Sequence, residues 1–236
     1  FGIHTSFTFQ TFPVGMFTVF EMRWTDRIAE VFAALQTMAL AAPEALGMKL
    51  SVKAEAGAPG LKLSILGQLA GPQAELLALL APVFAMHRPE TSVVEERSYW
   101  DAQEFLSEDG TPEYSHERSR FARGALSGEA IDTILANLRA WPGTTVAATW
   151  KFFLMGGRID AVSPTDTAFV HRGASMITSA ELEWTPADSP EVLAKNQQWL
   201  SRFHDRMEAY TSAYCYQNFI DPSQRDHLDA YYGENL

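Results

Sequence analysis

Hydrophobic and polar positions follow two periods in the first hundred residues. Apolar side chains alternate with polar ones in five stretches, which is typical of strands buried on one face; these are residues 1–9, 16–24, 48–53, 61–66 and 92–97. Between them, apolar residues recur at steps of three and four after Thr25 and again after Gly71-Pro72, which predicts two helices. From residue 16 onward, the predicted order is β-α-β-β-α-β.

The same order is predicted again after a long loop at residues 104–117. Ser127 and Ser189 precede amphipathic helices, and alternation predicts four strands, at residues 118–123, 144–155, 175–184 and 214–220. Each copy can form a four-stranded antiparallel sheet with its helices on one face. We therefore predict an α+β fold in which two ferredoxin-like units join edge to edge into one wide antiparallel sheet. One face of that sheet stays open.

Composition excludes several function classes. The chain has 236 residues and a formal net charge of −11, with 18 Lys and Arg against 29 Asp and Glu, so a nucleic-acid or anionic-membrane surface is not expected. The single cysteine, Cys215, lies in a predicted strand, where a buried apolar role is expected. The six histidines are scattered without the spacing of metal ligands, so no metal site is expected.

The sequence also contains no predicted membrane-spanning segment, phosphate-binding loop or hydrolase nucleophile. The longest apolar run, residues 76–86, contains Pro82 and is shorter than the ~20 residues that span a bilayer. Gly156-Gly157-Arg158 lacks the spacing of a phosphate-binding loop and is interpreted as a turn, and no serine stands in a nucleophile elbow. We expect a soluble protein, either cytoplasmic or secreted, and the Ala-rich helices are typical of bacterial proteins.

Both ends of the chain carry motifs of one enzyme family. Tyr216-Gln-Asn218-Phe219-Ile-Asp221 is followed by a short polar stretch that ends in Tyr231-Tyr-Gly-Glu-Asn-Leu236, and the chain opens with Phe1-Gly-Ile-His-Thr-Ser-Phe-Thr-Phe9. These segments resemble the C-terminal signature and the flavin-domain segment of the berberine bridge enzyme-like FAD-linked oxidases, within the vanillyl-alcohol oxidase superfamily. The open sheet face implied by periodicity agrees with that family, whose broad sheet forms a wall over the flavin.

The resemblance implies that the chain is the substrate-binding half of a longer enzyme. Residues 1–14 would be a terminal strand of a missing FAD-binding domain, residues 15–221 the substrate-binding domain, and residues 222–236 the start of a segment that returns to the FAD domain. FAD would be bound mainly by the missing domain, and the fragment alone is expected to be inactive. The substrate would lie between the sheet and the flavin and would transfer a hydride to FAD. O2 would then reoxidise the reduced flavin.

The segment Phe169-Val-His171-Arg172 through Ser179 to Trp184 also resembles the family pattern. The resemblance places Ser179 at a substrate-facing position where family members often carry Gln or Glu. A hydroxyl can hydrogen-bond a substrate but is a poor base near neutral pH. Glu181, on the same face of the same strand, can take the role of base, and a solvated or salt-bridged carboxylate is the structural alternative.

In the C-terminal motif, Phe219 stands where many family members carry a second tyrosine that helps to deprotonate the substrate. The resemblance leaves Tyr216 as the local phenol and implies that Phe219 contacts substrate and Asn218 contacts the edge of the flavin ring. It also implies that backbone near the N-terminus lies along the FAD, at Gly2, Ile3 and Thr5.

Residues 149–155 form a predicted strand that is largely apolar on both faces, so one face meets helices and the other a pocket. We assign Trp150 and Phe152 to the pocket as substrate contacts, with sheet core as the alternative. Two other functions remain open for the whole chain. A duplicated split β-α-β sheet also serves cofactor-less monooxygenases, and the departures at Ser179 and Phe219 fit a redox-inactive small-molecule binding module.

Overall fold

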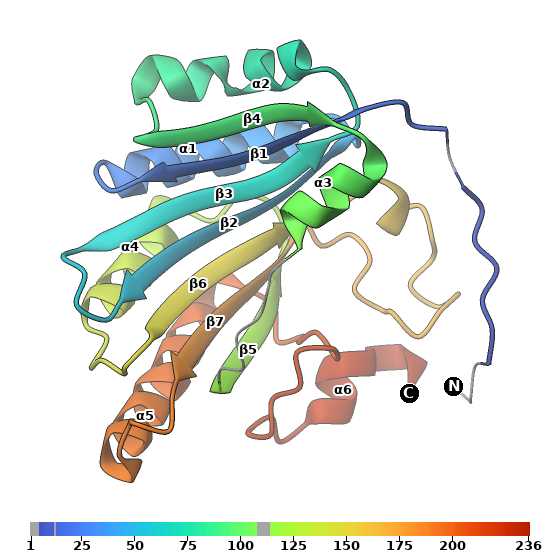
Figure 1. The fold of residues 1–236 in the computed structure, drawn as a ribbon. Coiled ribbons are helices and arrows are strands. Elements are labelled where there is room, and N and C mark those ends of the chain that lie inside the picture. The colour runs from blue at the N-terminus through green and yellow to red at the C-terminus, as the bar shows by residue number, and fades with distance from the viewer. Residues whose placement is uncertain (1–4, 12, 108–113) are drawn as a thin grey trace.

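The computed structural model describes residues 5–11, 13–107 and 114–236, and it contains one broad sheet with helices on one side (Figure 1). The first half consists of β1 (Phe17–Trp24), α1 (Ile28–Ala41), β2 (Leu46–Glu55), β3 (Leu61–Leu69), α2 (Gln73–Met86) and β4 (Thr91–Arg97). Its strands lie in the order β4-β1-β3-β2. The predicted β-α-β-β-α-β unit is therefore confirmed.

The second half contributes α3 (Tyr99–Leu106), β5 (Tyr114–Ala122), α4 (Gly128–Arg139), β6 (Ala147–Leu154), β7 (Met176–Trp184) and α5 (Pro190–Met207). In the described part of the chain the sheet has seven strands in the order β4-β1-β3-β2-β6-β7-β5, and every neighbouring pair is antiparallel. The α+β class and the edge-to-edge joining of two units are confirmed, with β2 and β6 as the joining pair. The loop expected from residue 104 is shorter, because α3 extends to Leu106 and β5 begins at Tyr114.

Local sequence explains where the elements begin and turn. Gly57 and Gly60 have positive φ angles in the turn between β2 and β3, a conformation that glycine adopts without steric cost. The side chains of Ser127 and Ser189 cap α4 and α5 by accepting hydrogen bonds from the backbone N–H three residues later. The predicted helix starts at both serines are confirmed.

The core lies between the sheet and the helices that cover one face. α1, α4 and α5 lie behind the sheet in the view of Figure 1. Phe32 of α1 packs against Trp150 and Phe152 of β6, with ring centroids 5.4 and 6.2 Å apart. Both β6 rings are almost completely buried. Our placement of Trp150 and Phe152 in a pocket on the open face was wrong, because the strand register turns them toward the helices.

On the opposite face of the sheet, α3 covers only one part (Figure 1). Ala102 of α3 is fully buried, and the Arg97 guanidinium at the end of β4 lies 4.8 Å from the centre of the Phe105 ring. α3 therefore rests on the β1 and β3 side of this face. Among the residues that the structure describes, no helix lies over the face of β6, β7 and β5.

The strand predicted at residues 214–220 does not form, which is a second correction. These residues lie in turns and irregular backbone. Ser212 N–H still donates to the Phe121 carbonyl of β5 (2.8 Å), but the Cys215 N–H donates to the Ala230 carbonyl and the Tyr216 N–H to the Ser119 hydroxyl. The backbone donors that would extend the sheet are thus used elsewhere.

Ala230 belongs to the short helix α6 (His227–Tyr232), which is followed by Gly233. At the other end, residues 5–11 lie outside any helix or strand. Residues 5–9, the described part of the strand predicted at residues 1–9, therefore do not form a strand. Gly2 and Ile3 lie outside the described residues. No helix in the described ranges has the length and apolar character needed to cross a bilayer.

The two adjacent phenylalanines of β6 test the assignment of faces. Replacing Phe152, fully buried beneath α1, with alanine should lower the free energy of unfolding by about 3–5 kcal/mol. Phe153→Ala, on the half-buried open face, is the matched control and should cost roughly 1 kcal/mol. Urea unfolding measures both. Equal losses for the two variants would contradict the assignment.

Candidate functional site

Four polar side chains meet on the open face, and we call them the Lys151 cluster: Glu117, Lys151, Ser179 and Glu181. The Lys151 ammonium lies 2.8 Å from Glu181 Oε2 and 3.1 Å from Glu117 Oε1. The Ser179 hydroxyl donates to Glu117 Oε1 at 2.6 Å. Glu117 of β5 and Glu181 of β7 are direct cross-strand partners. Like charges opposite each other destabilise a sheet, and Lys151 from β6 compensates them.

Burial makes this cluster electrostatically unusual. Each of the three charged side chains is only about 14–16% exposed. Desolvation raises the pKa of Glu117 above its ordinary value, the Glu181 charge acts in the same direction, and Lys151 opposes both. Desolvation also disfavours the charge on Lys151, but the two carboxylates outweigh it and raise the pKa of its ammonium. Lys151 therefore stays charged at neutral pH, and Glu117 holds protons more readily than an exposed carboxyl.

The cluster forms part of the wall of a cavity of about 650 Å³ on the open face, which we call the sheet groove. Besides the three charged residues of the cluster, the groove is lined by Gly47, Phe153 and Phe219. The rings of Phe153 and Phe219 lie 5.9 Å apart. Gly47 of β2 adds no side chain to the groove, and a Cβ at this position would meet no atom within 4 Å. The groove combines charge with aromatic surface.

A second cavity, of about 430 Å³, lies at the β5 edge of the sheet, and we call it the edge pocket. Its lining includes His116, Trp184, Asn218 and, from the sheet groove, Glu117 and Phe219. Because Glu117 and Phe219 line both cavities, they form the boundary between the two. A ligand in either cavity can reach the Glu117 side chain.

Phe219 is placed by an ionic anchor two residues later. Asp221 is almost fully buried and lies 2.6 Å from the Arg118 Nε and 3.2 Å from the His116 Nε2. Although burial opposes its charge, hydrogen bonds from His116, Ser223 and Arg118 hold the pKa of Asp221 well below its usual range. Its backbone N–H donates to the Tyr231 hydroxyl of α6. The segment therefore passes around the β5 edge and is fixed on the helix side.

Aromatic rings fill the open face next to β5. His171 stacks on Phe121 with centroids 4.0 Å apart and bonds through Nε2 to the Tyr231 carbonyl. Its Nδ1 is buried without a hydrogen-bond partner in the ranges that the structure covers. Burial lowers the pKa of His171 to about 4, so the ring is neutral at physiological pH. In this protein His171 is part of the aromatic packing that supports Tyr216, whose ring packs edge-on against Phe121.

The structure brings together some of the residues predicted for the site. Ser179 and Glu181 belong to the Lys151 cluster, and Glu181 is salt-bridged, the alternative that the sequence left open. Phe219 lines both cavities, and Asn218 lines the edge pocket and donates to the Tyr216 hydroxyl at 3.0 Å. Tyr216 itself lines neither cavity.

The remaining predicted residues lie elsewhere. Trp150 and Phe152 are in the core, Thr5 is exposed in irregular backbone, and Gly2 and Ile3 fall outside the described residues. No group of three His, Cys, Asp or Glu side chains that could hold a metal occurs among the residues that were placed.

Sequence reasoning missed Glu117, Lys151 and Gly47. One signal was present, since Lys151 interrupts the apolar run of β6 and a lone charge within such a strand needs a partner. Its partners come from β5 and β7, and only the cross-strand register identifies them.

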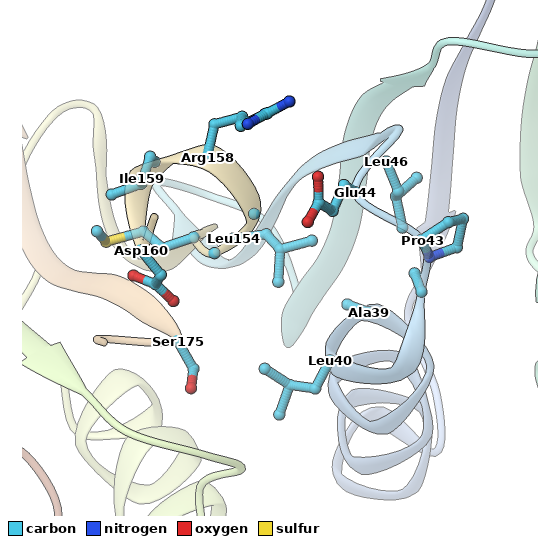
Figure 2. Close-up of a pocket in the computed structure, with 14 residues that line it drawn as sticks. Ala39, Leu40, Pro43, Glu44, Leu46, Leu154, Arg158, Ile159, Asp160 and Ser175 are labelled. Carbon is cyan, nitrogen blue, oxygen red and sulfur yellow. The ribbon is translucent and has the colours of Figure 1, made fainter. Parts of the chain in front are cut away.

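Another cavity, of about 520 Å³, lies where α1 ends and β6 leads into η1 (Gly157–Ile159). Figure 2 shows Leu154 between Glu44 on one side and Asp160 on the other. Asp160 Oδ1 accepts a hydrogen bond from the Gly173 N–H at 2.8 Å, which fixes the loop before β7. None of the predicted site residues lines this cavity, and we assign it no part in the chemistry.

The sequence is similar to one curated oxidoreductase over its whole length. It is 29% identical over 239 residues to YgaK of Bacillus subtilis (strain 168), which is described as an uncharacterised FAD-linked oxidoreductase. The aligned region covers 100% of this chain and 51% of that protein. The chain therefore spans about half the length of its relative. No family model matches the sequence.

Solved structures agree in fold. BBE-like 1 of Physcomitrella patens superposes with a TM-score of 0.76 at 22% identity, covering 94% of this chain and 49% of that chain. A berberine bridge enzyme variant in complex with (S)-reticuline superposes with a TM-score of 0.75 at 17% identity, covering 93% of this chain and 50% of that chain. At such identities the structures establish the fold. Together with the oxidoreductase relative, they confirm the resemblance that the terminal motifs indicated.

The ionic anchor at Asp221 gives a stability prediction. Asp221→Ala leaves the Arg118 guanidinium buried without its carboxylate, and the free energy of unfolding should fall by about 3 kcal/mol or more. Because the pKa of Asp221 is lowered in the folded protein, the contribution is present at neutral pH and is lost as pH falls through that lowered value.

Glu55→Gln is the matched control, because Glu55 pairs with Lys62 at an exposed position of the same sheet. Its cost should stay below about 1 kcal/mol. Denaturant unfolding at pH 7 compares the two variants. Equal effects would show that the Asp221 pair does not anchor the segment.

Proposed function

We propose that this chain, a relative of the FAD-linked oxidoreductases with the fold of the berberine bridge enzyme-like proteins, forms the substrate-binding part of an FAD-dependent oxidoreductase. The observation that carries the proposal is the match over the whole chain to an FAD-linked oxidoreductase of about twice its length. The sheet groove, on the face that no helix covers beside β6 and β7, supports it. The substrate is proposed to be a small organic molecule.

The sheet groove is the proposed substrate site. Its volume of about 650 Å³ falls within the range of ~300–1,000 Å³ that small-molecule pockets occupy. Its aromatic rings offer apolar contact, and the Lys151 cluster offers both donors and acceptors. We propose that Glu181 contacts the substrate and that Phe219 packs against it. Ser179, expected from the sequence to contact the substrate, is almost fully buried and does not line the groove, so its proposed role is to hold Glu117 through their hydrogen bond. Tyr216 orients the Asn218 amide through the hydrogen bond between them, and Asn218 is proposed to contact the edge of the flavin ring.

The described residues fit the flavin ring of FAD better than its pyrophosphate. A planar ring system suits the rings of Phe153 and Phe219 and the Asn218 amide. The pyrophosphate does not suit a groove that carries two buried carboxylates. We therefore propose that FAD is held mainly by a domain beyond this chain. Residues 1–14 and 222–236 are proposed to belong with that domain, and residues 15–221 to form the substrate-binding domain.

When bound, FAD would supply the redox chemistry by accepting a hydride from the substrate, with O2 as its oxidant. This chain would contribute position and proton transfer. The aromatic side of the groove would orient the substrate and exclude water, and the Lys151 cluster would hold its polar group. Positioning of this kind can account for a large part of an enzyme's rate enhancement.

An absorbance spectrum of the full-length gene product that carries this chain tests the proposal. We expect a flavin band in the purified protein, either retained or released on acid denaturation, and peroxide formation with at least one member of a panel of small alcohols. A colourless full-length protein would overturn it. A cofactor-less monooxygenase or a redox-inactive binding module would then account for the fold.

Gly47 allows the substrate site to be tested separately. Gly47→Leu places a side chain into the sheet groove, and its Cβ would meet no atom within 4 Å, so the unfolding free energy should change by less than about 1 kcal/mol. The KM of the best substrate should rise on the order of tenfold, because 1.4 kcal/mol of lost binding gives that factor. Gly47→Ala is the control and should leave KM within about threefold. An unchanged KM in Gly47→Leu would place the substrate elsewhere.

A further inference from the structure

We propose that Glu117 is the catalytic group that accepts the substrate's proton in the sheet groove, and that Lys151 is the positioning residue that orients it. The inference rests on the proposed function and adds a residue that neither the sequence motifs nor the similar proteins assign. Its foundation is the position of Glu117, which lines both the sheet groove and the edge pocket and is held there by Ser179 and Lys151.

The orientation of Glu117 is fixed by two donors on one oxygen. The Ser179 hydroxyl at 2.6 Å and the Lys151 ammonium at 3.1 Å both contact Oε1. Two contacts from different strands hold the carboxylate plane, and we assign proton acceptance to Oε2. A base must be held within hydrogen-bond reach of the proton that it takes, which a fixed carboxylate satisfies better than a mobile one.

Glu117 fits the role better than its cross-strand partner Glu181. Glu181 binds Lys151 at the shorter distance of 2.8 Å, and the cavity that it lines on its other side contains further charged side chains of the sheet. Glu117 instead lies beside Phe219, where the aromatic wall of the groove begins. Burial also raises the pKa of Glu117, and a base with a pKa nearer neutrality is more effective at physiological pH.

The charged groups around Glu117 are few. Lys151 from β6 and Glu181 from β7 face it directly, and Lys49 from β2 lines the same groove. Its neighbours on β5, His116 and Arg118, point to the other face and bind Asp221. Burial raises the pKa of Glu117 most, and of the neighbouring charges Lys151 lowers that pKa while Glu181 raises it.

The step conserves atoms and electrons. The O–H bond of a substrate hydroxyl breaks, the proton passes to Glu117 Oε2, and the electron pair stays on the substrate oxygen. That pair forms the second C–O bond as the hydrogen on the adjacent carbon leaves with its two electrons, which FAD would accept when bound. Glu117 becomes a neutral carboxyl, and the product is a carbonyl compound.

Three variants of the full-length protein test the inference. Glu117→Gln keeps the size and hydrogen bonds of the side chain but cannot accept a proton, so the rate of flavin reduction by the best alcohol should fall on the order of 100-fold or more. Glu181→Gln removes the negative charge opposite Glu117, and its readout is the pH dependence of the rate, since Glu181 is itself a proposed substrate contact. Lys151→Met removes the positive charge from the same cluster.

The pH dependence separates catalysis from a structural role. Removing Lys151 takes away the charge that lowers the pKa of Glu117, so the acid limb of the pH–rate profile should move to higher pH. Removing Glu181 takes away the charge that raises it, so the acid limb should move to lower pH. Opposite shifts are expected only if Glu117 is the titrating base. Shifts in the same direction, or none, would overturn the assignment.

A readout without turnover completes the test. Carbon-13 NMR of glutamate-labelled protein should show one carboxyl with a raised pKa that disappears in Glu117→Gln and shifts oppositely in the other two variants. Absence of flavin from the full-length protein would defeat the proposed function, whatever the carboxyl titration shows. A flavin-containing, active protein in which Glu117→Gln works as fast as wild type would defeat this inference alone. If Glu117→Gln does not fold, the opposed shifts in the other two variants decide.

Discussion

The pairing of β2 with β6 is the constraint on which the rest of the structure depends. It joins two units into one sheet, and its register places Val52 opposite Trp150. Because side chains alternate along a strand, this register sends Trp150 to the helices and Lys151 to the open face. A slip by one residue would bury the Lys151 ammonium beneath α1 and expose the largest ring of the strand. The same backbone pairing therefore determines both the core and the proposed site.

Two ionic clusters lie on opposite faces of the sheet at β5, and they have different roles. On the helix side, Asp221 is almost fully enclosed and joins Arg118, so it anchors the segment that carries Phe219. On the open side, the Lys151 cluster keeps partial exposure and lines a cavity. Partly desolvated charges seldom improve stability over apolar packing, and perturbed pKa values gather at functional sites. A cavity beside such a cluster is what distinguishes a site from a structural ion pair.

Local patterns predicted most of the fold because the periods of strands and helices depend on neighbouring residues. The seven observed strands and the four long helices that cover the sheet's other face were recovered in order. The strand expected at residues 214–220 failed because the Cys215 N–H bonds to α6, a competition that no local pattern reveals. The face of Trp150 and Phe152 was wrong because β6 is apolar on both sides, and only the register decides between them. The partners of Lys151 were missed for the same reason.

Ser179 shows how a neighbouring strand can supply a chemical group that a strand lacks at one position. The resemblance places Gln or Glu at this position in many family members, and a serine there alone suggests a lost function. In the folded protein, Glu117 of the adjacent strand reaches the Ser179 hydroxyl at 2.6 Å, so a carboxylate occupies the space above it. Neighbouring strands lie only about 4.8 Å apart, a distance that one side chain spans. The carboxylate that position 179 lacks is thus supplied by β5, which argues against interpreting the serine as a sign of a redox-inactive binding module.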